Sequence, residues 1–481
     1  MRIWEIILLI IIGAGLAFVW FQPKLKVKWV WAVMATFLLV ILVQGLGEGW
    51  RWQMVPAYLS PLFLLKRAAS IRPRESVEKR YRVLRITGKA LLLAVYLLVS
   101  IVLPLLMPVF TFKKPSGEYA VGTTVYHWVD QSRKEEYTED PSDQRELMVQ
   151  LWYPAEASSG KGTAAYTDQA SAIAEGLNKA LSLPSFALSH LGQIQTHALI
   201  DAKLAVTDQP YPLLIFSHGL TGFRSQNTFE LEELASHGYI VAAIDHTYDA
   251  AATVFPDGRE AIIRFENLSG FDKLDDHMKL WTGDVSFVLD QLTGLNSGVE
   301  ASQFKGRMDM TRIGMFGHSY GGAAAAQMLM NDARIKAAVD MDGVLYGKPA
   351  PAGGIGKPFL LMNAEKSLNK TIFEANLDKA IQTTGKSRAS YEEFWEEGQH
   401  RRALATAGGG YSMLIPNTDH MSYTDFHLFS PMLKLKGEDP RYVHQVVNAF
   451  TLAFFDNYLK GKTGGLEAAA AAYPEVGFKQ H

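Results

Sequence analysis

Residues 312–330, RIGMFGHSYGGAAAAQMLM, decide the fold. The apolar run RIGMF has the character of a strand, and the small residues after position 321 have the character of a helix. Between them, the pentapeptide GHSYG (317–321) fits the pattern G-x-S-x-G. A strand, a sharp turn and a helix in this order are the context of a nucleophile elbow, which exposes a serine at the end of a sheet. Ser319 is therefore the candidate nucleophile.

The neighbours of Ser319 have supporting roles in such a turn. Gly317 and Gly321 let the strand and the helix approach closely, and the helix N-terminus favours negative charge that develops beside it. His318 flanks the site, but it does not occupy the chain position of a base, so we interpret it as a packing or hydrogen-bonding neighbour.

Apolar strands alternate with amphipathic helices from about Gly117 onward. The expected strands are 145–154, 212–219, 239–245, 312–319, 335–342, 357–363 and 411–417, and the expected helices include 229–238 and 281–295. Near-continuous apolar strands separated by helices are typical of a parallel sheet covered on both faces. The pattern predicts the α/β class over 113–481 with a mostly parallel, doubly wound sheet, and the serine turn within it indicates the α/β-hydrolase fold.

A serine nucleophile needs a general base, which follows the acid in the chain order of this fold. The histidines after the nucleophile are His400, His420, His427, His444 and His481. His420 is the candidate base, because it follows the last expected strand in the loop NTDHMSYTDF (417–426). His400 lies in a charged helical stretch, and His427 and His444 lie in or near the closing helical region.

The orienting acid stays open at this point. Asp340 and Asp342 both end the strand IKAAVDMD (335–342), and alternation points them to the same side. Glu365 follows the next strand. Periodicity does not separate the three carboxylates.

The oxyanion hole needs two backbone N–H donors. One is expected from Tyr320, directly after the nucleophile, and the other from the loop after an earlier strand. The sequence SHGL (217–220) ends such a strand, and Leu220 is the expected donor because Gly219 allows the turn that aims its N–H inward. His218 is interpreted as a neighbour of the site.

The first 112 residues have a different character. They carry a net charge of +10, against −12 for the rest of the chain, and they contain the longest uncharged runs. A helix needs about 20 apolar residues to cross the hydrocarbon core. We expect membrane spans at about 3–21, 29–47 and 90–112, with 52–65 as a possible fourth, and the first run as a retained anchor rather than a cleaved signal peptide.

The positive charges predict the orientation. Three lysines lie between the first two runs, and residues 66–89 carry nine basic and two acidic side chains. Positive loops tend to stay cytoplasmic. If 52–65 crosses, both loops lie inside, and everything after residue 112 lies outside the cytoplasm at a cell membrane. The alternative is an interfacial 52–65, since 14 residues with Pro56 and Pro61 make a short span.

The composition excludes several classes of protein. The chain has 481 residues, with 47 basic and 49 acidic side chains, and its net charge of −2 argues against a nucleic-acid partner. It has no cysteine, which excludes disulfides, thiolate metal sites and a cysteine nucleophile. No metal or organic cofactor is implied.

Several blocks resemble the plasma/type II platelet-activating-factor acetylhydrolase family of α/β-hydrolases and its bacterial dienelactone-hydrolase-like relatives. The resemblance runs over roughly 117–480 and is carried by LWYPA (151–155), FSHGLTGFRSQNTFELEELASHGYIVAAIDH (216–246), GHSYGG (317–322), DMDG (340–343), HMSYTDF (420–426) and FFDNYLKGK (454–462). It implies Asp342 as the acid and Leu220 and Tyr320 as the oxyanion donors. Dienelactone hydrolases proper use a cysteine nucleophile, which this chain lacks.

The expected function is a membrane-anchored serine ester hydrolase. The resemblance implies short-acyl or oxidised phospholipid-type esters as substrates. The alternatives are a general carboxylesterase, lipase or polyester hydrolase, and a non-catalytic membrane protein with a degenerate hydrolase domain. Residues 156–205 form an insertion between strands, which could cap the pocket, touch the membrane or pack as a surface helix pair.

Overall fold

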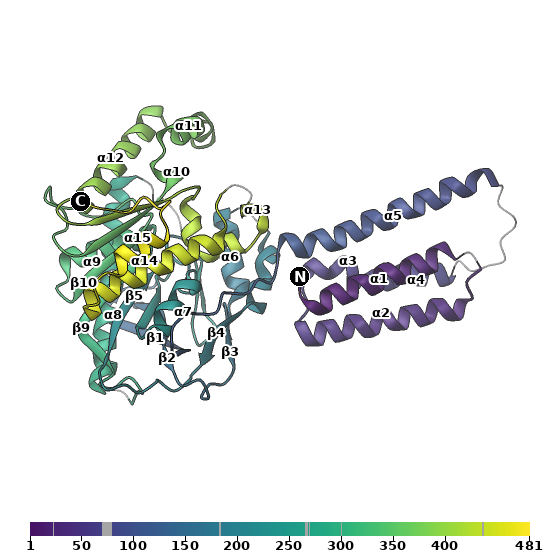
Figure 1. Cartoon of the computed structure of the whole chain (residues 1–481), viewed down its shortest axis with the longest axis horizontal. Coiled ribbons are helices and arrows are strands. Elements are labelled where there is room, and N and C mark those ends of the chain that lie inside the picture. The colour runs from purple at the N-terminus through teal and green to yellow at the C-terminus, as the bar shows by residue number, and fades with distance from the viewer. Residues whose placement is uncertain are drawn as a thin grey trace.

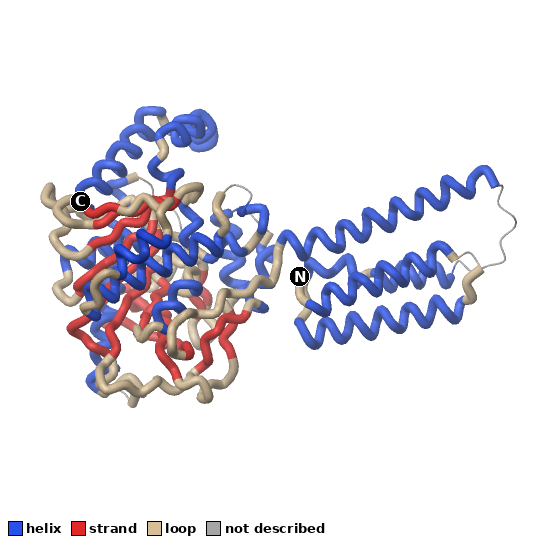
Figure 2. The backbone as a smooth tube through the Cα atoms, in the orientation of Figure 1, coloured by secondary structure: helices blue, strands red, loops and turns tan. Residues whose placement is uncertain are grey.

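The computed structural model describes residues 1–481 except 23, 70–78, 182–183, 265–267, 269, 300 and 435–436. An all-helical arm at the N-terminus extends from a strand-rich domain (Figures 1 and 2). The arm comprises α1 (Ile3–Phe21), α2 (Val27–Glu48), η1 (Trp52–Met54), α3 (Val55–Tyr58), α4 (Ser60–Ala69) and α5 (Lys79–Leu106). Part of the basic stretch 66–89 falls outside the described residues.

Three helices of the arm are long and apolar enough to cross a membrane: Ile3–Phe21, Val27–Glu48 and Ile86–Leu106. The stretch expected as a fourth span, 52–65, is helical, but it is divided among η1, α3 and α4. Two prolines explain the breaks, because a proline removes a helical N–H donor. In Figure 1, α1 and α4 run away from the strand-rich domain, and α2 and α5 return toward it.

The expected span 90–112 is wrong at its C-terminal end. Helix α5 stops at Leu106, and the next residues leave the helix. Phe110 and Phe112 are buried in the core of the strand-rich domain, where their rings meet edge to face. The apolar character of 107–112 therefore reflects packing in that core.

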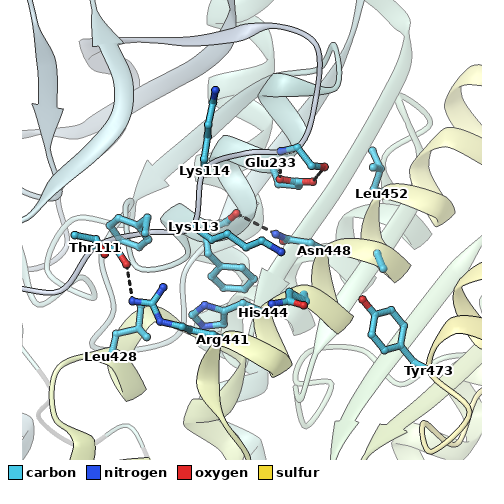
Figure 3. Close-up of a pocket in the computed structure, with 15 residues that line it drawn as sticks. Thr111, Lys113, Lys114, Glu233, Leu428, Arg441, His444, Asn448, Leu452 and Tyr473 are labelled. Carbon is cyan, nitrogen blue, oxygen red and sulfur yellow. Dashed lines mark hydrogen bonds between the residues drawn. The ribbon is translucent and has the colours of Figure 1, made fainter.

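The segment after α5 crosses the surface of the strand-rich domain between two helices. It lines a cavity of about 260 Å³ together with residues of α7 (Thr228–Ser236) and α14 (Pro440–Lys460). Figure 3 shows Arg441, at the start of α14, donating to the Thr111 carbonyl at 2.9 Å. This bond fixes the segment to the domain.

The strand-rich domain is built on one sheet of eleven strands. Their order is β13-β12-β11-β10-β9-β5-β6-β2-β1-β4-β3, and the six strands from β12 to β6 are parallel. The bounds are β1 (Ala120–Lys134), β2 (Gln144–Ala155), β3 (Thr163–Ala165), β4 (Gln195–Ile200), β5 (Tyr211–Ser217), β6 (Ile240–Asp245), β9 (Met308–His318), β10 (Ile335–Met341), β11 (Phe359–Ala364), β12 (Tyr411–Ile415) and β13 (Lys479–Gln480). β7 (Ala252–Val254) and β8 (Glu260–Ile262) form a separate hairpin.

All seven expected strands are present, but β1 was not expected. It pairs along almost its whole length with β2 in antiparallel register, Ala120 opposite Ala155. Several of its side chains remain partly exposed, so it lacks the continuous apolar run that marks the central strands. The α/β-hydrolase fold predicted from the sequence is confirmed.

Helices cover both faces of the sheet. One apolar core lies between the sheet and α7, α14 and α15 (Gly465–Ala472); the other lies between the sheet and α8 (Phe271–Ser297) and α9 (Tyr320–Asn331). Alternate residues of each central strand enter opposite cores, as Leu213 and Leu214 do. The remaining helices are α6 (Ala170–Leu181), η2 (Ser185–Gln193), α10 (Glu365–Leu368), α11 (Lys370–Thr384), α12 (Arg388–Thr406), η3 (His420–Tyr423), η4 (Asp425–Leu428) and α13 (Pro431–Lys434).

The insertion 156–205 contributes β3 and β4 to the sheet edge and places η2 against the arm. The Trp52 indole N–H donates to the Ala187 carbonyl at 3.3 Å, and its ring meets Phe186 edge to face. The Gln193 amide donates to the Trp50 carbonyl at 2.6 Å. These contacts join the arm to the strand-rich domain.

Candidate active site

The candidate nucleophile lies at the turn between β9 and α9. Ser319 has φ 57° and ψ −117°, a strained conformation for a non-glycine residue that is expected of a nucleophile elbow. Glycines make the turn possible. A Cβ at Gly317 would lie 2.3 Å from the carbonyl carbon of Gly321. A Cβ at Gly321 would lie 2.1 Å from the backbone carbonyl oxygen of Ser217.

His420 connects the serine to a carboxylate. Its Nε2 lies 2.9 Å from Ser319 Oγ, and its Nδ1 lies 2.8 Å from Asp342 Oδ2. The imidazole is 42% exposed, whereas the Asp342 side chain is fully buried. The histidine begins η3, whose N-terminus is capped by the Asp419 carboxylate. This candidate base is therefore fixed in position yet accessible to solvent.

The Asp342 carboxylate is held on both oxygens. Its Oδ1 accepts from the Ala364 N–H at 2.9 Å, and its Oδ2 accepts from the Ser367 hydroxyl at 2.6 Å. Burial alone would raise the pKa of Asp342, but the hydrogen bond and electrostatic interaction with His420 and the positive charge of Arg402 outweigh burial and lower it. The side chain is thus an ionised acceptor for the imidazole.

The other two candidate acids lie elsewhere. Asp340 is buried and accepts from the Gly343 N–H at 2.8 Å, and its second oxygen has no partner among the described residues. Burial raises the pKa of Asp340 to about 8, against a weaker opposing effect of the Gly343 hydrogen bond. Glu365 accepts from the Asn417 N–H at 2.7 Å. Of the three carboxylates, Asp342 is the one that meets His420.

His318 supports the loop of the base. Its Nε2 donates to the His420 carbonyl at 2.8 Å. Burial lowers the pKa of His318 to about 3, so its ring is neutral. The remaining candidates lie apart: His400 is exposed on α12, His444 bonds the Thr424 carbonyl, and His481 bonds Ser412. His427 pairs with Asp419 at 3.1 Å.

The two expected oxyanion donors flank Ser319. Tyr320 is the first residue of α9, so its amide has no acceptor in its own helix. The other donor lies on the loop after β5, and a Cβ at Gly219 would be 3.2 Å from the Ser319 Cβ. Within the described part of the chain, the Leu220 amide has no hydrogen-bond acceptor. Both N–H groups therefore remain available beside the serine.

A cavity is lined by aromatic and charged side chains, and one of them, Tyr346, contacts Tyr320, which itself does not line the cavity. Phe271, Tyr346 and Phe394 contribute to its lining, and the rings of Tyr320 and Tyr346 lie 5.5 Å apart. Arg401 stacks over Phe271 at 4.1 Å. The walls come from α8, the segment after β10, and α12. Among the described residues, no cluster of His, Asp or Glu has the arrangement of a metal site.

Sequence reasoning missed two contacts at this site. The Ser367 hydroxyl on Asp342 follows no periodic pattern, because its helix α10 has only four residues. The bond from His318 to the His420 carbonyl joins positions 102 residues apart. Only the fold brings these groups together.

A family model described as platelet-activating factor acetylhydrolase, isoform II, matches residues 107–264 and 277–465, which is more than half of the chain. The chain belongs to this family. It is a serine ester hydrolase with the α/β-hydrolase fold. The resemblance noted from the sequence is confirmed, and the match begins just after the last helix of the arm.

Individual relatives agree with this assignment. The platelet-activating factor acetylhydrolase of Cavia porcellus is 26% identical over 73% of this chain and 78% of its own length. A probable 1-alkyl-2-acetylglycerophosphocholine esterase of Arthroderma benhamiae is 25% identical over 77% of this chain and 94% of its own length. Among solved structures, a ferulic acid esterase from Streptomyces cinnamoneus is 31% identical, with a TM-score of 0.58 over 76% of this chain and 97% of that chain.

Proposed function

We propose that Ser319 attacks the carbonyl carbon of an ester while His420 Nε2 takes the proton of its hydroxyl. The observation that carries this proposal is the continuous relay Ser319–His420–Asp342, with hydrogen bonds of 2.9 and 2.8 Å. The Asp342 carboxylate keeps the Nδ1 proton on the imidazole and stabilises the imidazolium that forms. The N–H groups of Leu220 and Tyr320 bind the oxyanion of the tetrahedral intermediate.

The reaction proceeds through an acyl-enzyme and ends with release of the acid. His420 gives its proton to the departing alcohol, which leaves Ser319 acylated. The same imidazole then activates a water, which attacks the acyl carbonyl, and Ser319 recovers its proton when the acid departs. The 42% exposure of the His420 side chain supports this step, because water can reach the ring.

We propose phospholipid-type esters with short or oxidised acyl chains as substrates. Relatives named platelet-activating factor acetylhydrolase and 1-alkyl-2-acetylglycerophosphocholine esterase support this class. The α-helical arm would place the site near a lipid surface. A second candidate, a carboxylesterase for aromatic esters, is supported by the likeness to a ferulic acid esterase.

The arm is proposed to anchor the chain in a cell membrane with the catalytic domain outside the cytoplasm. The lysines between α1 and α2, and the described part of 66–89, lie at the end of the arm away from the catalytic domain (Figure 1). Positive loops favour the cytoplasmic side. Protease added to intact cells should cleave the catalytic domain, and full protection would overturn this orientation.

The function is tested with the full chain in detergent micelles. Wild type and Ser319→Ala should be compared on p-nitrophenyl acetate, a feruloyl ester and a 2-acetyl phospholipid. We expect the variant to lose roughly 10⁴-fold or more in kcat with its thermal midpoint unchanged. A fluorophosphonate probe should label wild type alone. Retained activity in Ser319→Ala would refute the assignment, and an unlabelled, inactive wild type would favour the non-catalytic alternative.

A further inference from the structure

A second hydrogen-bonded row of serine, histidine and aspartate side chains lies next to the loop after β5, here called the oxyanion loop because it carries Leu220. Ser217 Oγ is 2.6 Å from His246 Nε2, and His246 Nδ1 is 2.9 Å from Asp284 Oδ2. The three residues come from the end of β5, the end of β6 and the middle of α8. Nothing in the proposed mechanism so far uses them.

This row is not a second active site, because it is sealed. Ser217, His246 and Asp284 each have 0% of their surface exposed. The Trp281 ring stacks on the His246 ring at 3.8 Å and 15°, and the Arg145 guanidinium binds Asp284 at 2.7 Å. A substrate carbonyl has no approach to the Ser217 hydroxyl.

The protons in the row are assigned by charge and burial. Burial opposes ionisation of Asp284, but Arg145 and His246 outweigh it, so its pKa is lowered and the group is a carboxylate. Burial lowers the pKa of His246 more strongly than Asp284 raises it, so the ring is neutral. Nδ1 therefore carries the proton toward the carboxylate, and Nε2 accepts from the Ser217 hydroxyl.

The row reaches the oxyanion loop through His218. The His246 backbone N–H donates to His218 Nε2 at 3.2 Å, so the His218 proton is on Nδ1. From there it donates to the Gly219 carbonyl at 2.6 Å. The ring is fully buried, which lowers the pKa of His218 to about 3 and keeps this tautomer neutral.

The direction of the Gly219 carbonyl sets the direction of the next N–H. The peptide bond between Gly219 and Leu220 is trans, so its C=O and N–H lie in one plane and point in opposite directions. His218 Nδ1 at 2.6 Å and the Gly222 N–H at 2.8 Å both donate to this carbonyl and fix its direction. The Leu220 N–H is then directed to the opposite side.

We propose that His218, whose tautomer is fixed by the backbone N–H of His246, a member of the buried row Ser217–His246–Asp284, is the positioning residue that aims the Leu220 N–H into the oxyanion hole. The inference rests on the proposed function, in which Leu220 binds the oxyanion. Its advantage is preorganisation: a donor fixed before the reaction needs no reorientation as charge develops.

Two amide variants of His218 test the inference. In His218→Asn the amide N–H replaces Nδ1 and should still reach the Gly219 carbonyl. In His218→Gln the amide should take the Nε2 position and leave that carbonyl with the Gly222 N–H as its remaining donor. Loss of one oxyanion donor costs about 10²–10³-fold in kcat. We expect His218→Gln to lose roughly 10–100-fold in kcat with KM nearly unchanged, and His218→Asn to keep most of its kcat.

A transition-state analogue distinguishes positioning from general damage. A trifluoromethyl ketone forms an oxyanion on Ser319, so its inhibition constant should rise in His218→Gln by the same factor by which kcat falls. His190→Leu serves as the control, because it removes a different buried histidine, which bonds Gln53 in the arm. This control should lower the thermal midpoint without changing the ratio of inhibitor affinity to KM.

Each outcome has one meaning. Equal kcat in the Asn and Gln variants would overturn the role of His218, even if both are slow. If His218→Gln does not fold, an active, folded His218→Asn must still bind the ketone as wild type does, and a weakened complex would refute the inference. A wild type with no esterase activity would instead refute the proposed function itself.

Discussion

The two aspartates at the end of β10 allow a matched test of the acid. Asp342→Asn keeps the shape of the side chain, and its remaining oxygen still accepts from the Ala364 N–H. The new amide N–H faces His420 Nδ1 across 2.8 Å and requires that nitrogen to be an acceptor. The imidazole proton then lies on Nε2, which faces Ser319 Oγ and cannot take its proton.

The size of the expected loss in kcat follows from this unproductive tautomer of His420. We expect kcat on p-nitrophenyl acetate to fall about 10³–10⁴-fold, equivalent to about 4–5 kcal/mol of transition-state stabilisation. Asp340→Asn is the control, two residues away in the same buried strand end. Because the pKa of Asp340 is raised to about 8, that side chain is mostly neutral at pH 7, and an amide should leave kcat within about 3-fold.

The assay is the steady-state rate of each purified variant, with thermal unfolding to confirm that both are folded. Both variants should remain folded, since each replacement retains the carbonyl oxygen that binds a backbone N–H. Equal losses in the two variants would refute the assignment of Asp342. So would an Asp342→Asn enzyme that keeps more than about 10% of the wild-type kcat.

Three further predictions concern stability. Gly321→Ala should lower the free energy of unfolding by about 1–3 kcal/mol and also slow turnover, because the added Cβ would lie 2.1 Å from the backbone carbonyl oxygen of Ser217. Thermal unfolding measures the first effect and kcat the second. Burial raises the pKa of Glu230 from 4.5 to about 7, so the free energy of unfolding falls as pH rises between these values. Glu230→Gln should therefore raise the free energy of unfolding by up to about 3 kcal/mol at pH 8 and leave it unchanged at pH 4. A pH-independent gain in denaturant titrations would contradict this. Arg51→Leu should cost up to about 3 kcal/mol, because it leaves the buried Glu5 with one of its two arginine partners, Arg2 at 2.7 Å. Combining it with Glu5→Leu should cost less, as thermal unfolding in detergent would show; an additive double variant would argue against the ion pair.

The sequence predicted the elbow and the central sheet because both leave local signals. Ser319 lies in a pentapeptide whose glycines are required by close backbone contacts, and the expected strands are continuous apolar runs covered on both faces. It predicted β1 poorly, since a half-exposed antiparallel strand lacks such a run. It also extended the last expected span to 112, because apolar residues that are buried in a protein core have the same composition as those in lipid.

The choice of acid shows the limit of sequence reasoning most clearly. Asp340 and Asp342 share one strand end, and periodicity points them the same way. Asp342 has φ 58°, outside the strand, and this turn of the backbone carries its carboxylate toward His420 while Asp340 stays under Gly343. A single backbone dihedral, fixed by contacts with distant strands, decides between them.

The sequence by itself determined the class of this protein: apolar periodicity and the serine turn specify an α/β-hydrolase, and the long uncharged runs specify a helical arm. Those properties are local, so a short window of residues carries them. The tertiary structure alone decided which carboxylate meets the histidine, where the arm ends, and how a buried row from β5, β6 and α8 meets the oxyanion loop. Such pairings join residues that are far apart in the chain, as Ser319 and His420 are at 101 positions, and only the packing of the sheet and its helices defines their distances.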